Sequence, residues 1–225
     1  MQVSRKTVRR KVVRDINAAK AAEAVGNIEP GCEIYGLSKG QFSLVELIGH
    51  CLEATGPADI IVSTWTAAGA DLEHTHGLLE NGNIRSARWL VDSSFINRQP
   101  GYTQRLLDLF GEEAVLATKN HAKFVLIENE TWSLVIRTSM NLNLNSRLES
   151  YEVSDCRPMA DMLKTLYEGI KAEGLTAKRA QTARKDCDSG LTNVLGQIKA
   201  KDLNIEYDAT KGIGHEKTAK NVSYD

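Results

Sequence analysis

Residues 121–153 read HAKFVLIENETWSLVIRTSMNLNLNSRLESYEV and contain two apolar segments with a short polar connection. The first segment covers residues 121–128, the second covers residues 132–141, and Asn129–Thr131 separate them. Two β-rich segments with so short a connection are typical of an antiparallel hairpin. Such a hairpin places the start of its first strand beside the end of its second strand.

Apolar and amphipathic segments alternate on both sides of this hairpin. Strands are predicted for residues 32–38, 58–66, 84–95, 114–120 and 150–155, and helices for residues 43–54, 69–82, 101–111 and 159–174. Ser43 is expected to cap the first of these helices, and Gly82 to end the second. The alternation predicts an α/β fold, in which a mixed central sheet is flanked by helices on both faces.

The composition is that of an ordinary globular protein, with 42% hydrophobic and 25% charged residues. No apolar run reaches the length of about 18 residues that a membrane-spanning helix needs, so no stable membrane insertion is expected. The four cysteines are widely spaced without a CxxC pair, which argues against a zinc ribbon and favours a reducing cytoplasm. The basic start of the chain is also compatible with an organellar transit peptide.

Charge is distributed unevenly along the chain. Of its 28 basic and 29 acidic groups, residues 1–20 hold seven basic and one acidic, so the remainder has 21 and 28 and a net charge of −7. Apolar residues at helical spacing predict a helix in this basic segment. The basic side chains on the opposite side of that helix are those of Lys6, Arg10, Arg14 and Lys20. The helix could simply cover the core, or it could bind the phosphates of a nucleic acid.

These patterns divide the chain into three parts. We expect a basic helical arm over residues 1–30, an α/β domain over residues 31–175, and a polar extension over residues 176–225. The extension has few apolar residues that could anchor it, so we expect it to be loosely ordered or to pack on a partner.

Four side chains that can take part in chemistry meet at the predicted hairpin. His121 and Lys123 are two residues apart at the start of the first strand, so they project to the same side of the sheet. Ser139 and Asn141 have the same spacing at the end of the second strand. A nucleophilic imidazole, a fixed cation and two neutral hydrogen-bonding groups are what phosphoryl transfer requires.

These residues resemble the signature of the phospholipase D superfamily, which is HxKxxxxD followed by a strand turn and GSxN. The first part is matched by His121, Lys123 and Glu128, and the second part by Thr138, Ser139 and Asn141. Glu128 stands where the family usually has Asp, a position that is largely structural in the family, and Thr138 replaces the glycine. Nine residues separate Glu128 from Thr138, more than the family usually has, which predicts a longer hairpin.

The resemblance implies one phospholipase D-like half over roughly residues 30–175, with phosphodiesterase activity that needs no metal ion or other cofactor. It implies that His121 is the nucleophile and that Lys123 and Asn141 hold the phosphate. The family also has an acid after GSxN that orients the histidine. Glu149 is our first choice for this acid and Glu152 the second. Only one of them can serve, because strand alternation puts the two on opposite faces.

A chain with a single motif would complete its site by forming a symmetric homodimer, in which one His121 is the nucleophile and the other protonates the leaving group. The basic arm favours nucleic acid as the partner and substrate, with DNA as the first choice. The expected activity is therefore that of a nuclease. Two alternatives remain open. One is a phospholipid hydrolase or transferase of the same superfamily, and the other is an inactive DNA-binding scaffold with this fold.

Overall fold

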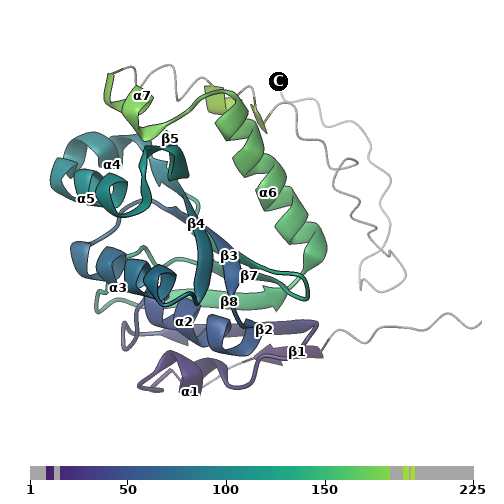
Figure 1. Cartoon of the computed structure of the whole chain (residues 1–225). Helices are drawn as coiled ribbons and strands as arrows, with labels where there is room; N and C mark the ends of the chain where they lie inside the picture. The colour runs from purple at the N-terminus through teal and green to yellow at the C-terminus, as the bar shows by residue number, and fades with distance from the viewer. Residues whose placement is uncertain (1–8, 13–15, 183–189, 193, 196–225) are drawn as a thin grey trace, which may run out of the picture.

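The computed structural model describes residues 9–12, 16–182, 190–192 and 194–195, and an eight-stranded sheet forms its centre (Figure 1). The strand order is β1-β2-β8-β7-β6-β3-β4-β5. The strands are β1 (Arg9–Val12), β2 (Cys32–Ser38), β3 (Ala58–Thr64), β4 (Ile84–Asp92), β5 (Val115–Thr118), β6 (Phe124–Glu128), β7 (Ser133–Thr138) and β8 (Glu149–Asp155). The helices are α1 (Ala21–Val25), α2 (Leu44–Thr55), α3 (Gly69–Glu80), α4 (Ser93–Arg98), α5 (Pro100–Phe110), α6 (Arg157–Ala172) and α7 (Ala177–Thr182), with a 3₁₀ turn at Glu112–Ala114.

The sheet is mixed, as the sequence predicts. β3, β4 and β5 pair in parallel, and helices connect them, as parallel crossovers require. β6, β7, β8 and β2 pair antiparallel, and the short turn between β6 and β7 confirms the predicted hairpin. No helix within the described residues has both the length and the apolar character needed to cross a membrane.

Helices cover both faces of this sheet. Arg88 and Trp89 are neighbours in β4, so their side chains leave the sheet on opposite faces. The Arg88 guanidinium lies 5.4 Å from the ring centroid of Tyr167 in α6. The Trp89 ring lies 4.8 Å from that of Phe110 in α5. The predicted α/β class, with a mixed central sheet flanked by helices, is therefore confirmed.

α2 begins where the sequence predicts. The backbone N–H of Glu46 donates to Ser43 Oγ (3.2 Å), and the backbone N–H of Ser43 donates to Glu46 Oε2 (2.6 Å). This capping box satisfies two backbone donors that the first turn of a helix leaves free. The helix then buries Leu47, Ile48 and Cys51 completely against the sheet. A local polar signal and an apolar face at helical spacing together specify this element.

The strand predicted for residues 84–95 is too long. β4 ends at Asp92, and α4 follows directly. The Asp92 carboxylate accepts a hydrogen bond from the backbone N–H of Ser94 (2.8 Å), so it caps the new helix. The apolar residues that suggested a longer strand, among them Phe95, are buried as part of this helix instead.

The predicted basic helix at the N-terminus is wrong over residues 9–12, which form β1 and pair in parallel with β2. β2 would otherwise present an open row of backbone donors and acceptors, and β1 satisfies them. The next helix, α1, begins only at Ala21, after the exposed Lys20. Arg10 lies in β1, whereas Lys6 and Arg14 lie outside the described residues.

The start of the polar extension belongs to the folded domain. The backbone N–H of Ala117 in β5 donates to the carbonyl oxygen of Leu175 (2.8 Å). Beyond it, α7 packs against α4 and β5 and buries Ala177 and Ala180. The boundary expected at residue 176 therefore does not separate α7 from the domain. Most of the extension beyond α7 lies outside the described residues.

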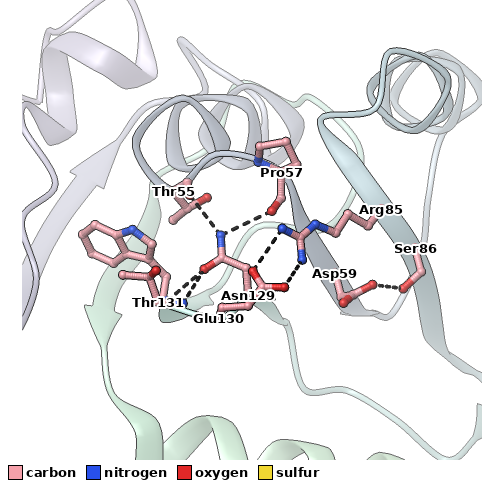
Figure 2. A network of polar contacts seen from close by, with 9 residues as sticks. Thr55, Pro57, Asp59, Arg85, Ser86, Asn129, Glu130 and Thr131 are labelled. Carbon is pink, nitrogen blue, oxygen red and sulfur yellow. Dashed lines mark hydrogen bonds and ion pairs between the residues drawn. The ribbon is translucent and has the colours of Figure 1, made fainter.

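The turn between β6 and β7 is fixed by polar contacts at the end of the sheet (Figure 2). Asn129 Nδ2 donates to the carbonyl oxygen of Thr55 (2.9 Å), and Asn129 Oδ1 accepts from the backbone N–H of Thr131 (3.0 Å). The guanidinium of Arg85 donates to both carboxylate oxygens of Glu130, at 2.6 and 3.0 Å. The hairpin is thereby tied to the end of α2 and the start of β4.

Gly36 in β2 is required by the tyrosine opposite it. Gly36 pairs with Tyr151 of β8, and a Cβ atom at Gly36 would lie 2.3 Å from the Tyr151 hydroxyl oxygen. Tyr151 is buried, and its ring meets that of Phe42 edge-on with centroids 5.7 Å apart. We expect Gly36→Ala to lower the free energy of unfolding by about 2 kcal/mol, because this overpacking forces the tyrosine to move. Urea unfolding of the variant and wild type measures the difference.

The matched control is Gly49→Ala. Gly49 lies inside α2, and nothing lies within 4 Å of a Cβ atom placed there. Alanine should stabilise this helix by roughly 0.5–1 kcal/mol. Equal stability changes in the two variants would contradict the proposed clash with Tyr151.

Candidate active site

The candidate site lies at the end of the sheet where β6 begins and β7 ends. The backbone N–H of Thr138 donates to the carbonyl oxygen of Lys123 (3.2 Å), which continues the hairpin beyond the pair Phe124 and Arg137. β6 itself starts at Phe124, so His121 and Lys123 precede the strand rather than begin it. The hairpin nevertheless brings this segment beside Thr138, as the sequence predicts.

Lys123 holds its ammonium group against the imidazole of His121. Lys123 Nζ lies 3.2 Å from His121 Nδ1 and 3.4 Å from Nε2, and it donates to the His121 carbonyl oxygen at 2.9 Å. His121 is exposed, whereas Lys123 is half-buried. One bound anion could therefore contact the cation and the ring nitrogen together.

A buried polar network positions the backbone of this segment. The backbone N–H of Asn120 donates to Asp92 Oδ2 (2.9 Å), and Asn120 Nδ2 donates to Ser63 Oγ (3.0 Å). Asn120 Oδ1 accepts from the backbone N–H of Ala122 (3.0 Å), and Ser63 Oγ donates to the Ala122 carbonyl oxygen (2.8 Å). The residues on both sides of His121 are thus fixed to β3 and β4. We did not predict this network from the sequence.

Glu149, at the start of β8, is the acid that reaches the site. Ser139 Oγ donates to Glu149 Oε2 and accepts from the backbone N–H of Ser150 (2.9 Å). Partial burial lowers the pKa of Lys123, and the carboxylate of Glu149 raises the same pKa. No hydrogen bond among the described side chains joins Glu149 to His121 itself. Glu149 therefore acts on the site through Ser139 and Lys123.

Glu152, the second choice for this acid, has a different partner. It pairs across the β7–β8 ladder with Arg137, and the two side chains form an ion pair. Strand alternation indeed separates it from Glu149, which lies toward Ser139.

Thr138, which replaces the glycine of the superfamily motif, has a structural role. Its Oγ1 donates to the carbonyl oxygen of Ser150 (2.7 Å) and accepts from the backbone N–H of Met140 (3.0 Å). These two bonds shape the chain as it leaves β7. The hydroxyl therefore helps to place Ser139 and does not obstruct the site.

Asn141 does not line the cavity of His121. It lines a separate small cavity together with Glu149, Asn143 and Asn145, whereas His121 lines a larger one. Asn141 Oδ1 is buried and has no hydrogen-bond partner among the described residues. The structure therefore brings Asn141 to Glu149 but not into the cavity of His121.

The larger cavity has a volume of about 570 Å³ and is open to solvent. Its polar side is formed by His121, Lys123, Arg137 and Ser139, and its apolar side by Phe124, Met159, Met162 and Leu163. Arg137 was not singled out from the sequence, although it lies next to the end of β7 and two residues before Ser139. The cavity thus combines cations and an imidazole with apolar side chains in one lining.

Glu128 is not part of this site. It lies at the opposite end of β6, where it forms ion pairs with Arg157 (2.6 Å) and Lys164 (2.8 Å) of α6. Its side chain is only 15% exposed, so these cations offset the cost of burying its charge. Glu128 therefore fixes α6 against the hairpin, and its inclusion among the catalytic candidates is corrected to a structural role.

Part of the basic arm lies at the same end of the sheet as the site. Lys39 Nζ donates to Asn17 Oδ1 (2.7 Å), and Lys39 follows Ser38, which pairs with Glu149. Lys20 is exposed three residues after Asn17. Among the described residues, no group of three or more His, Cys, Asp or Glu side chains could hold a metal ion.

An aromatic contact beside His121 was also missed. The ring centroid of Trp65 lies 5.9 Å from that of His121, and the guanidinium of Arg98 lies 4.0 Å from the Trp65 centroid. Trp65 directly follows the buried strand β3, and ligands of α/β proteins often bind outside the carboxyl ends of parallel strands. That position is the signal that could have identified it.

Glu149→Gln should lower the pKa of Lys123. The carboxylate raises this pKa against the effect of burial, so removing its charge leaves burial unopposed. The ammonium would then lose its proton at a lower pH than in wild type. NMR titration of the lysine side-chain signals, with Lys123 assigned by substitution, measures the change.

Glu152→Gln is the matched control, because Glu152 pairs with Arg137 and is not among the causes that shift the pKa of Lys123. It should leave the Lys123 titration in place. A Lys123 pKa that rises or stays constant in Glu149→Gln would show that the two groups are not coupled as the geometry indicates.

Comparison with known proteins leaves the family of this chain open. No protein-family model matches the chain, and no curated protein matches it. The resemblance to the phospholipase D superfamily therefore depends on the residues of the β6–β7 hairpin and on the geometry described above.

Proposed function

We propose that this protein is a metal-independent phosphodiesterase, a nuclease whose preferred substrate is DNA. The observation that carries the proposal is the contact between Lys123 Nζ and the His121 imidazole, at 3.2 Å, on the rim of an open cavity of about 570 Å³. Around it, Ser139 and Glu149 form a hydrogen-bonded pair. These are a nucleophile, a cation for the phosphate oxygens and a polar pair that fixes the surroundings.

In the first step, a ring nitrogen of His121 attacks the phosphorus atom of the phosphodiester. A nitrogen–phosphorus bond forms, and the bond from phosphorus to the leaving oxygen breaks. The leaving oxygen takes a proton from the imidazolium of His121 in a second copy of the chain. The ammonium of Lys123 stabilises the negative charge on the nonbridging oxygens.

In the second step, the second imidazole, now neutral, takes a proton from water. The water oxygen attacks phosphorus, the nitrogen–phosphorus bond breaks, and His121 is restored. Two histidines are needed because the nucleophile and the leaving group lie on opposite sides of phosphorus. Since the chain has one such motif, we propose a symmetric homodimer with a shared site. A role for Asn141 in holding the phosphate depends on the resemblance alone, because Asn141 lines the other cavity.

One observation supports nucleic acid as the substrate. Lys39 follows Ser38, which pairs with Glu149, so a further cation lies at the end of the sheet that carries the site. In addition, the described cysteines Cys32, Cys51 and Cys156 are free. Free thiols suit a reducing cytoplasm, where we place the activity.

One observation favours a second candidate, a phospholipid hydrolase or transferase. Part of the cavity lining is apolar and includes Phe124, Met159 and Met162. Such a lining could accommodate part of an acyl chain or glycerol backbone. The same surface could equally contact a sugar or base, so substrate comparison has to separate the two.

The first test of the proposed function compares substrates in the presence of EDTA. Wild type should cleave DNA faster than RNA and faster than phosphatidylcholine vesicles, and chelation should leave the rate unchanged. His121→Ala should reduce the rate at least about 100-fold, because it removes the nucleophile. The exposed His74 on α3 provides the control His74→Ala, which should retain activity.

Three results would contradict the proposal. Full loss of cleavage in EDTA, restored by a divalent metal, would reject the metal-independent mechanism. Preferred cleavage of vesicles would establish the second candidate. DNA binding without cleavage of any substrate would identify an inactive scaffold.

The second test concerns the shared site. Activity per protein should fall steeply on dilution, because the dimer dissociates and each monomer lacks one histidine. Mixtures of His121→Ala and Lys123→Ala chains should not regain full activity, since every mixed dimer lacks a required group. Sedimentation velocity across the same concentrations measures the dimer. A monomer with undiminished turnover would disprove the shared site.

A further inference from the structure

A stack of two side chains adjoins the candidate site, outside the cavity that His121 lines. The Arg98 guanidinium lies 4.0 Å from the centroid of the Trp65 ring. The same ring lies 5.9 Å from the imidazole of His121, at an interplanar angle of 54°. We call these two side chains the Trp65–Arg98 stack.

Arg98 is exposed and retains free donors. Its Nε donates to Ser94 Oγ at 3.3 Å, and no ion pair joins it to a carboxylate within the described residues. Arg85 and Arg157, by contrast, each have an acidic partner. An arginine at the C-terminal end of a short helix can interact favourably with the helix dipole. This role requires neither an aromatic ring in contact with the guanidinium nor free donors.

Trp65 gives the guanidinium a defined orientation. A guanidinium stacked on an aromatic ring is held by cation–π attraction, and its in-plane N–H groups stay free to bind an anion. Trp65 is itself partly buried after β3, so its ring offers a fixed platform. Arg98 therefore combines the rigidity and the free donors that phosphate recognition uses.

We propose that Arg98, oriented by Trp65, binds the phosphate that neighbours the reacting phosphate on a nucleic-acid strand. This inference rests on the proposed function, in which His121 attacks the reacting phosphate. The guanidinium and the imidazole both adjoin the Trp65 ring, at 4.0 and 5.9 Å from its centroid, so one strand can present neighbouring phosphates to the two groups. Phosphatidylcholine has one phosphodiester and no second phosphate, so the stack favours a polymer over such a lipid.

The first measurement compares two substrates. Bis(p-nitrophenyl) phosphate has one phosphodiester and no neighbour, whereas a single-stranded oligothymidylate has neighbouring phosphates. In Arg98→Gln, the ratio of kcat/KM for the oligonucleotide to kcat/KM for the small ester should fall roughly tenfold, as expected for the loss of one charge-assisted hydrogen bond. Arg85→Gln, at the opposite end of the sheet, is the matched control and should keep the wild-type ratio.

The second measurement needs no catalysis. Trp89 and Trp132 are buried at 0% and 9% exposure, so fluorescence changes on adding oligothymidylate should come mainly from Trp65. Removing one phosphate contact should flatten the plot of log affinity against log salt by about 0.7 for a single strand. We expect this change in Arg98→Gln and not in Arg85→Gln. Trp65→Phe should abolish the fluorescence response.

The outcomes separate this inference from the proposed function. A flatter salt dependence in Arg98→Gln together with an inactive wild type would support the Arg98 contact and reject the nuclease. Wild-type cleavage of oligothymidylate, with both the salt slope and the substrate ratio unchanged in Arg98→Gln, would overturn the Arg98 contact and leave the nuclease intact. An equal loss on both substrates would also overturn it, because the effect would then lie at the reacting phosphate.

Discussion

The hydrogen bonds of the buried Asn120, from its backbone and its side chain, are the constraint on which the candidate site depends. Asn120 joins the end of β4, through Asp92, to β3, through Ser63, and it holds the backbone N–H of Ala122. A buried polar network is costly unless each member is satisfied, and here the donors and acceptors of several elements satisfy one another. His121 lies between two residues of this network, so an exposed imidazole acquires a fixed backbone.

The same hairpin is fixed again at its other end. Asn129 ties the turn to α2, and Glu128 ties the end of β6 to α6 through Arg157 and Lys164. With both ends held, the hairpin is fixed in register, since a shift by one residue would break these polar contacts. Side chains at the end where β6 begins and β7 ends can then converge without being buried themselves.

Local signals predicted much of this architecture. The hairpin was predicted from two apolar segments and a polar connection, and the start of α2 from Ser43, because these signals act over a few residues. The position of β1 could not be predicted, since it depends on the free edge of β2. The Asn120 network and the Trp65–Arg98 stack could not be predicted either, because they join residues far apart in the sequence. Ser63 and Asn120, for example, are 57 positions apart. The separation of Glu149 from Glu152 was predictable, because it follows from strand alternation.

His121 has two kinds of neighbour, and under the proposed function they constrain the substrate. Its cavity is lined in part by apolar side chains of α6, and its ring lies 5.9 Å from that of Trp65 in the Trp65–Arg98 stack. A substrate that contacts both would carry an apolar or aromatic group next to one phosphate and a further anion beyond it. Repeating nucleotides offer this combination along a strand, whereas phosphatidylcholine offers one phosphate and no further anion. The two neighbours of His121 therefore support the proposed polymer substrate over such a lipid, even though the apolar lining alone would admit either.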